Sequence, residues 1–232
     1  MPKNWSRGFT KETHPSLLKI SQTMRNKKIN NFAKWQETMR LSGKMKSNYP
    51  DFKKDGNLAE LIGVVLGDGH IEIFPRTECL YVLSNSNNPG FIKRYSTLIE
   101  KTFQKEPTVT KMPHANCVRI RLYEKNISRR LGVPSGSRNR AKIEVPKWIL
   151  KNPDFVVRYL RGLYEAEGSF CVHLPTCTYK FLFAGVNQSM LGNVFKLVEG
   201  LGFHPHMGKK QVQVSRKEEV YRLKELIGFR VY

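Results

Sequence analysis

Residues 61–69 read LIGVVLGDG and residues 160–168 read LRGLYEAEG. The two stretches lie 99 positions apart and share one pattern: an apolar residue first, glycine third, a small residue seventh, an acid eighth and glycine ninth. A glycine inside a helix costs about 1 kcal/mol relative to alanine, so its recurrence in register requires a cause. We expect the small residues to form a bare face that lets two helices touch backbone to backbone.

The eighth position of each stretch holds an acid, Asp68 or Glu167. Each acid is expected at the end of its helix, where a carboxylate faces the negative end of the helix dipole. If the helices pack side by side, the two carboxylates lie at the same end and repel one another. Bound divalent cations offset both penalties, and hard oxygen ligands suit Mg²⁺. The matched pair therefore predicts a metal site.

Outward from each motif the chain repeats one order of elements. Residues 58–133 read as a helix, two alternating strands, a helix, two strands and a helix, and residues 156–232 restart the series. Residues 134–155 form a basic linker between the copies. The sequence thus predicts an α+β fold of two αββαββα repeats, a pseudo-symmetric dimer within one monomeric chain.

The whole chain carries 40 Lys and Arg against 19 Asp and Glu, a net charge of +21. Such a charge calls for a polyanionic partner, nucleic acid first and an anionic membrane surface second. The sequence shows neither an apolar run long enough to cross a membrane nor a secretory leader. We therefore expect no membrane partner and a cytoplasmic, nucleoid-associated or organellar location. The four cysteines lack zinc spacing.

The duplicated motif, its acid and the alternating strand directly after it resemble the LAGLIDADG homing endonucleases of the single-chain, two-repeat kind, over about residues 58–230. The resemblance implies motif helices packed at the interface and two antiparallel, saddle-shaped sheets in the DNA major groove. It implies metal-dependent hydrolysis of one phosphodiester in each strand of a double-stranded DNA site about 20 bp long. It also leaves intron RNA as a partner.

Under this resemblance, Asp68 and Glu167 are metal ligands shared across the interface, and the backbone carbonyls of Gly67 and Ala166 complete the coordination. Two or more Mg²⁺ ions are implied, because phosphodiester hydrolysis needs an activated water, a stabilised phosphate and a stabilised leaving group. Mn²⁺ or Ca²⁺ is expected to substitute in binding. Both acids then count as catalytic residues.

The resemblance also implies polar and basic residues around the cleavage pocket. By position, Asn85 ends the second strand of the first repeat, and Asn187 and Gln188 end that of the second. Family members often carry Gln or Lys there, so Asn85 is a departure. The basic pocket residue is expected in the loop after the fourth strand. Its candidates are Arg138, Arg140 and Lys142, which equally suit a linker that binds phosphates.

Strand alternation predicts which side chains face the DNA. The residues expected to face the core are Ile71, Ile73, Phe170, Val172 and Leu174. Those expected to contact base edges are His70, Glu72, Phe74, Arg76, Arg119 and Arg121 in the first repeat, and Ser169, Cys171, His173, Thr178 and Lys180 in the second. Those expected to contact phosphates are Lys209, Lys210 and Arg216.

Residues 1–57 hold thirteen Lys and Arg against four acids and are expected to form two helices, near residues 15–27 and 29–41. Residues 13–32 loosely resemble the short basic modules attached to many homing endonucleases, so accessory DNA binding is expected. A basic arm that adds only non-specific phosphate contacts is the alternative. Two rival functions use the same fold, an RNA maturase that assists intron splicing and a non-cleaving DNA-binding regulator.

Overall fold

The computed structural model of the chain describes residues 6–42 and 48–232. The chain divides into two compact units, Met1–Tyr49 and Pro50–Tyr232. The first unit holds two helices, α1 (Pro15–Asn26) and α2 (Asn31–Leu41), close to the two stretches expected. Among residues 6–30 and 32–42 none is buried, and Phe9, Leu18 and Trp35 are about half exposed. These helices therefore do not enclose an apolar core of their own.

The second unit contains two copies of one order of elements. The first copy consists of α3 (Gly56–Gly67), β1 (Gly69–Phe74), β2 (Thr77–Asn85), α4 (Pro89–Phe103), β3 (Thr108–Lys111), β4 (Cys117–Glu124) and α5 (Ile127–Leu131). The second consists of α7 (Pro153–Glu167), β5 (Gly168–His173), β6 (Thr178–Ala184), α8 (Gln188–Gly200), β7 (His206–Met207), β8 (Gln211–Val214) and α9 (Lys217–Ile227). The prediction of two αββαββα repeats is confirmed.

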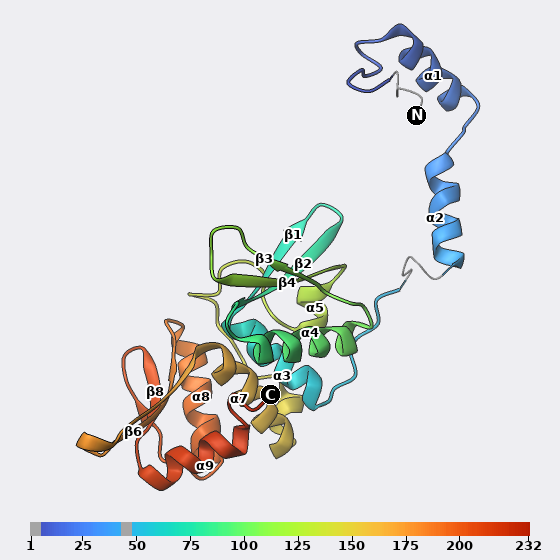
Figure 1. Cartoon of the computed structure of the whole chain (residues 1–232). Helices are drawn as coiled ribbons and strands as arrows, with labels where there is room; N and C mark the ends of the chain where they lie inside the picture. The colour runs from blue at the N-terminus through green and yellow to red at the C-terminus, as the bar shows by residue number, and fades with distance from the viewer. Residues whose placement is uncertain (1–5, 43–47) are drawn as a thin grey trace. The chain divides into compact units, whose positions relative to one another are not determined.

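Each copy folds its four strands into one antiparallel sheet, with the strand orders β1-β2-β4-β3 and β5-β6-β8-β7. Helices cover one side of each sheet, and α3 and α7 lie in the middle of the unit (Figure 1). Two elements were not expected, the short α6 (Lys147–Leu150) in the linker and a 3-10 turn, η1 (Leu174–Thr176), between β5 and β6.

The two motif helices touch along their glycines. A Cβ on Gly63 would overlap the carbonyl oxygen of Tyr159 and lie 3.1 Å from the Cα of Gly162. A Cβ on Gly162 would likewise overlap the carbonyl oxygen of Glu60 and lie 3.0 Å from the Cα of Gly63. The opposing atoms belong to the backbone, so only glycine fits at either position. The expected bare helix face is confirmed.

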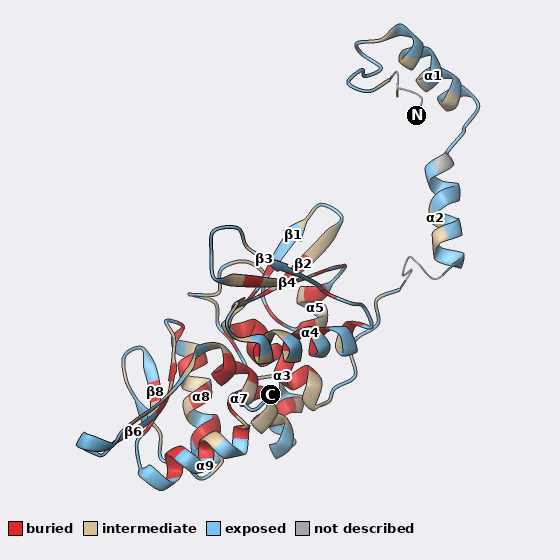
Figure 2. Ribbon diagram, viewed as in Figure 1, coloured by how far each residue is buried: buried red, intermediate tan, exposed pale blue. Residues whose placement is uncertain are grey.

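The core lies between the helices and the inner faces of the sheets (Figure 2). Ile71, on β1, is fully buried as expected. Two other core assignments were wrong, because Ile73 is 66% exposed and Leu174 is 68% exposed. Ile73 lies near the tip of the β1–β2 hairpin, which projects from the unit in Figure 1, and Leu174 lies in η1 rather than in a strand. Period-two alternation fails where a strand runs past the layer that covers it.

Candidate functional site

The helix contact brings the two motif acids to one end of the interface. Helix α3 ends at Gly67, with Asp68 as its C-cap, and α7 ends at Glu167. A Cβ on Gly67 would overlap the Cβ of Ala166 and lie 3.4 Å from the Cγ of Glu167. The side chain of Glu167 therefore lies against the end of α3, next to Asp68. The sequence predicted this pairing from the register of the two motifs.

Both carboxylates are destabilised as anions. Burial, and after it the negative charge of Glu167, raises the pKa of Asp68 to about 7. Glu167 is the more exposed of the two, and burial raises its pKa as well. Raised pKa values of this kind arise when a buried acid has no cation nearby to stabilise its charged form. The pair therefore has an unmet requirement for positive charge.

The donor set fits a hard divalent cation. Among residues 48–232, no ion pair or hydrogen bond involves the carboxylate of Asp68 or of Glu167. The backbone carbonyls of Gly67 and Ala166 lie in the last turns of their helices, where carbonyl groups lack helical partners. No cluster of three or more His, Cys, Asp or Glu side chains that suits a metal occurs in the described part of the chain. The site thus offers two carboxylates and backbone oxygens, which suit Mg²⁺ better than zinc.

A cavity of about 240 Å³ opens beside the acid pair. Gly67 and His70 line it from the first repeat, Glu167 and Asn187 from the second, and Arg138 from the linker. Arg138 donates from Nη2 to the carbonyl oxygen of Gly69, while its Nη1 is buried and lacks a hydrogen-bond partner among the described residues. Burial lowers the pKa of this guanidinium. Of the three linker candidates, Arg138 is the one whose side chain enters the pocket.

The side chain of Asn187, a residue predicted to end a strand, fixes the loop that carries Arg138. Strand β6 ends at Ala184, so the expectation that Asn187 and Gln188 end it was wrong. Asn187 is instead the buried N-cap of α8, with its Oδ1 accepting from the backbone N–H of Met190 at 3.0 Å. Its Nδ2 donates to the carbonyl oxygens of Arg138, at 2.6 Å, and Ala141, at 2.8 Å. An N-cap signature was readable in the sequence, but its contacts with the linker were not.

Two candidate catalytic residues lie outside this cavity. Asn85 ends β2 as expected, but it is exposed and accepts a hydrogen bond from the backbone N–H of Asn87 at 2.9 Å. Gln188 is also exposed and donates to the carbonyl oxygen of Lys209 at 3.0 Å. Neither residue lines the cavity that holds Glu167 and Arg138.

The outer face of the first sheet is polar and aromatic. His70, Tyr81 and Arg121 stand side by side across β1, β2 and β4. Tyr81 donates its hydroxyl to Glu72 at 2.8 Å, and the guanidinium of Arg119 lies 5.1 Å from the centre of the Tyr81 ring. Further along this face lies the half-buried Phe74, and Arg76 is exposed at the hairpin turn. The predicted outward residues thus share one surface, with Tyr81 as a central member that the alternation of β1 alone could not reveal.

The outer face of the second sheet is smaller and carries fewer charges. Ser169, Cys171 and His173 are exposed on β5, as expected, and Lys180 is exposed opposite Cys171. The half-buried Thr178 shares a hydrogen bond with Thr176, and their hydroxyl oxygens lie 2.8 Å apart. Three further residues that were not predicted from the sequence lie on the strands that complete this face: His206, Gln211 and Gln213.

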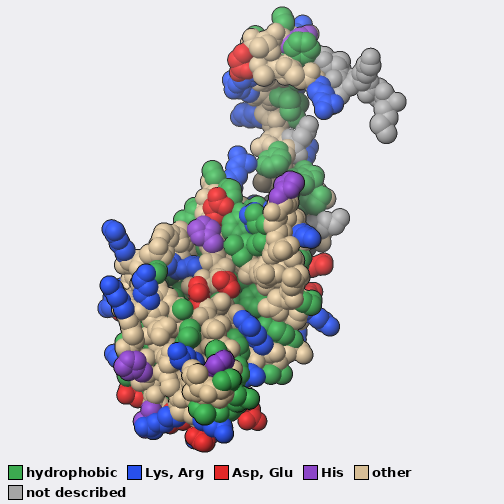
Figure 3. Space-filling model, turned by 60° about the vertical axis from the view of Figure 1, so that its left-hand side comes forward, with side chains coloured by type: hydrophobic (Ala, Val, Ile, Leu, Met, Phe, Trp, Pro, Cys, Tyr) green, Lys and Arg blue, Asp and Glu red, His purple; other side chains and the backbone are tan. Residues whose placement is uncertain are grey.

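The residues expected to contact phosphates differ in whether their charge is already paired within the protein. Arg140, Lys209 and Lys210 are exposed in loops, whereas Lys142 pairs with Glu144 at 2.7 Å on the surface. Arg216 is held between His204, at 2.7 Å, and Glu219, at 3.1 Å. Figure 3 shows acidic side chains near the middle of one face of the molecule, with Lys and Arg side chains on either side.

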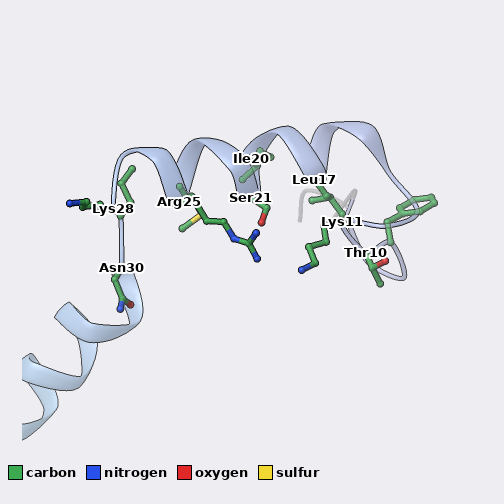
Figure 4. A pocket seen from close by; sticks show the side chains of 11 residues that line it. Thr10, Lys11, Leu17, Ile20, Ser21, Arg25, Lys28 and Asn30 are labelled. Carbon is green, nitrogen blue, oxygen red and sulfur yellow. The ribbon is translucent and has the colours of Figure 1, made fainter.

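The N-terminal unit has a basic groove of its own, of about 650 Å³, between α1 and the segment before it. In Figure 4 the side chains of Lys11, Ser21 and Arg25 lie on one side of α1. The apolar Leu17 and Ile20 line the same groove. A groove with cationic and apolar walls suits the phosphates and bases of nucleic acid.

No family model matches the chain. In structure it is similar to a mesophilic variant of the homing endonuclease I-DmoI (TM-score 0.52, 14% identity, 74% of this chain and 94% of the other). It is similar to I-DmoI in complex with DNA and Ca (TM-score 0.50, 15% identity, 74% of this chain and 88% of the other). It is also similar to the LAGLIDADG homing endonuclease I-LtrWI bound to target DNA (TM-score 0.51, 11% identity, 75% of this chain and 84% of the other). The fold of the chain is therefore the LAGLIDADG homing endonuclease fold.

One curated protein is similar in sequence, a tRNA-splicing ligase RtcB from Pyrococcus furiosus, which is 27% identical over 193 residues. The match covers 73% of this chain and 20% of the ligase, so this chain spans about a fifth of that protein's length. In the described ranges, no helix is long and apolar enough to cross a membrane.

Proposed function

We propose that the chain is a monomeric, Mg²⁺-dependent DNA endonuclease that makes a double-strand break in a site about 20 bp long. The observation that carries the proposal is the acid pair. Asp68 and Glu167 come from two repeats, lie at the same end of one helix contact, and both have raised pKa values. A fold-only role would not repeat an unneutralised acid at the same end of the helix contact in both copies.

The chain's own residues have separate tasks in this reaction. Asp68 and Glu167 would hold the cations together with the carbonyl oxygens of Gly67 and Ala166, and bound cations would supply an activated water and charge stabilisation at the phosphate. Arg138 lines the cavity, its buried Nη1 lacks a hydrogen-bond partner among the described residues, and its guanidinium would donate to a phosphate oxygen as negative charge develops. His70 lines the same cavity and contacts the DNA or the ordered water beside the phosphate.

The sheets are proposed to read the DNA. Arginine contacts guanine edges in the major groove, and hydroxyl groups contact several bases. Arg119 and Arg121 in the first sheet, and Thr178 and Lys180 in the second, lie on the faces that would meet the bases. The loops with Arg140, Lys209 and Lys210 would contact phosphates, which position the protein without reading sequence. The N-terminal unit adds accessory contacts in the same way.

Two rivals share this fold. An RNA maturase would bind intron RNA tightly, and that function can coexist with cleavage. A non-cleaving regulator would bind a specific duplex and leave it intact. The presence of both acids and both interface glycines favours the nuclease, because a regulator has no use for a metal site. Two of the solved structures named above are bound to DNA, one of them together with Ca, which supports the nuclease.

The deciding experiment is cleavage of a randomised duplex library with Mg²⁺ by the native chain, Asp68→Asn and Glu167→Gln. We expect the native chain alone to yield a recoverable site, and each variant to lose cleavage by at least about a hundredfold while it still binds the recovered site. Lys196→Ala, an exposed change on α8, is the matched control and should cleave normally. Specific binding by all proteins without cleavage by any would leave the regulator as the better account.

A further inference from the structure

A second cavity, of about 320 Å³, lies at the other end of the motif helices. Asn57 lines it at the start of α3, eleven residues before Asp68. At a rise of 1.5 Å per residue the two positions lie about 16 Å apart along the helix axis. The cavity is therefore separate from the acid pair, and nothing in the proposed cleavage reaction uses it.

The walls of this cavity are cationic. Lys93, Arg94 and Lys101 come from α4, Arg158 comes from α7, and no acidic side chain lines the space. The ring of Tyr232, which packs on the start of α4 at Gly90, closes one side together with Leu98. The N-terminal ends of α3 and α4, marked by Asn57 and Gly90, also reach the cavity and add partial positive charge.

The positive charge exceeds what the neighbouring acids neutralise. Glu60, fully buried behind the cavity, accepts from the Nε of Arg94 at 2.6 Å and from the Nε of Arg158 at 2.6 Å. Arg161 lies 3.7 Å from the same carboxylate. One carboxylate thus faces three guanidinium groups, and the exposed Lys93 and Lys101 add two more cations.

A second acid, Glu165, is also buried, and it accepts from the hydroxyl of Tyr232 at 2.5 Å. It lies close enough to Arg94 to act on the pKa of that guanidinium. Two carboxylates against five cations still leave a surplus of positive charge.

The second repeat supplies an internal control. The N-cap residues Asn88 and Asn187 are 99 positions apart, as are the two motifs, so the same offset relates α4 to α8. At the positions of Lys93, Arg94 and Lys101 the second repeat has Gly192, Asn193 and Gly200. A residue that the fold requires at the helix contact recurs in both copies, as Gly63 and Gly162 do. The basic cavity occurs in one copy, so the fold does not require it.

We propose that this cavity binds a phosphate-bearing ligand. Its volume lies at the lower end of the range for small-molecule sites, roughly 300–1,000 Å³. Lysine ammonium groups bind phosphate as compact charges, guanidinium groups add directional donors, and the Tyr232 ring offers a face for a base or sugar. The phosphate comes either from a free nucleotide or from the backbone of a nucleic-acid strand on the helical side of the molecule.

The test measures binding of three probes to the full chain without added divalent metal, at about 150 mM salt, where long-range attraction is screened. The probes are inorganic tripolyphosphate, ATP and a fluorescently labelled single-stranded RNA of twelve nucleotides. The variants are Lys93→Ala/Lys101→Ala and the control Lys125→Ala/Lys196→Ala, which removes two exposed lysines outside the cavity. Thermal unfolding confirms that both variants are folded.

We expect the Lys93→Ala/Lys101→Ala variant to weaken binding at least tenfold and the control to change it less than twofold. An effect on tripolyphosphate and ATP assigns the cavity to a free nucleotide, and an effect on the RNA alone assigns it to a strand; both support the proposal. Equal weakening by the two variants, or no binding of any probe, overturns it. None of these measurements depends on DNA cleavage, so the proposal stands or falls separately from the nuclease function.

Discussion

The two repeats of this chain agree in the elements that build the fold and the acid pair, and they differ in the residues around the second helix and the last strand of each copy. Both have the interface glycine, the acid at the helix end, an Asn cap 99 positions apart and the same strand order. Only the first repeat has the cationic side chains Lys93, Arg94 and Lys101 on its second helix, α4. Its last strand, β4, has eight residues, whereas the corresponding β8 has four. The features shared by the copies build the fold and the acid pair, and the unshared features are the candidates for recognition of a ligand.

The largest effect is expected at the shared glycines. Gly63→Ala or Gly162→Ala should lower the free energy of unfolding by about 3 kcal/mol, because the new methyl group meets backbone that cannot move aside. Urea denaturation measures the change. Gly192→Ala, inside α8 with nothing within 4 Å of the new Cβ, is the control and should raise the free energy of unfolding by about 1 kcal/mol. Equal effects at positions 63 and 192 would contradict the backbone contact.

A smaller effect separates the two Asn caps. Asn187→Ala removes a cap and two bonds to the linker, and we expect a loss of about 2 kcal/mol in the free energy of unfolding. Asn88→Ala removes one cap bond, of 3.4 Å, and should cost about 0.5 kcal/mol. Chemical denaturation of both variants gives the difference. If the two costs were equal, the contacts between Asn187 and the linker would contribute nothing to stability.

Replacing each of the two acids should change the pH dependence of the free energy of unfolding by a different amount. Asp68 has a folded pKa near 7, above its ordinary value of 3.8, so the folded state holds the proton more tightly than the unfolded state. The native, metal-free chain therefore loses stability as the pH rises between these values. Asp68→Asn removes this loss, so its free energy of unfolding relative to that of the native chain (its advantage) should rise by about 2–3 kcal/mol from pH 5 to pH 8.

Glu167→Gln should show a smaller growth, because Glu167 is the more exposed acid. Thermal unfolding at the two pH values, with and without Mg²⁺, measures both advantages. Added Mg²⁺ should stabilise the native chain at pH 8 and reduce the advantage of Asp68→Asn. A constant advantage across pH would mean that the acid is not destabilised in the folded state.

The smallest effect concerns the two sheet faces. Arg119→Ala should weaken binding to the recovered DNA site by about 1 kcal/mol, roughly fivefold, because a guanidinium contact with a base edge is lost. Lys180→Ala, on the second sheet, should lower the ratio of specific to non-specific binding less than Arg119→Ala does, because an ammonium group offers a charge without a fixed donor geometry. Fluorescence anisotropy with specific and scrambled duplexes measures the two ratios. Equal ratios for both variants would argue against a difference between the two base contacts.

The sequence predicted the parts of the molecule that local patterns encode. The acid pair and the glycine contact were predicted because each rests on a nine-residue pattern that occurs twice. The contacts of Asn187 with Arg138 and Ala141 were not, since they join residues 49 and 46 positions apart without any periodicity. Ile73 was misplaced because alternation does not show where the covering layer ends, and Leu174 because it does not show where the strand ends. The basic cavity combines α3, α4, α7 and the last residue, and only the fold brings these together.

The contact between α3 and α7 also restricts how the two copies can change over evolution. Gly63 and Gly162 each face main-chain atoms of the other helix, so no second substitution makes room for a larger residue at either position. Gly67 faces the methyl group of Ala166 instead, and exchanging the pair, alanine for glycine on one helix and glycine for alanine on the other, keeps the volume constant. In related chains we therefore expect positions 67 and 166 to covary, while positions 63 and 162 stay glycine independently of one another.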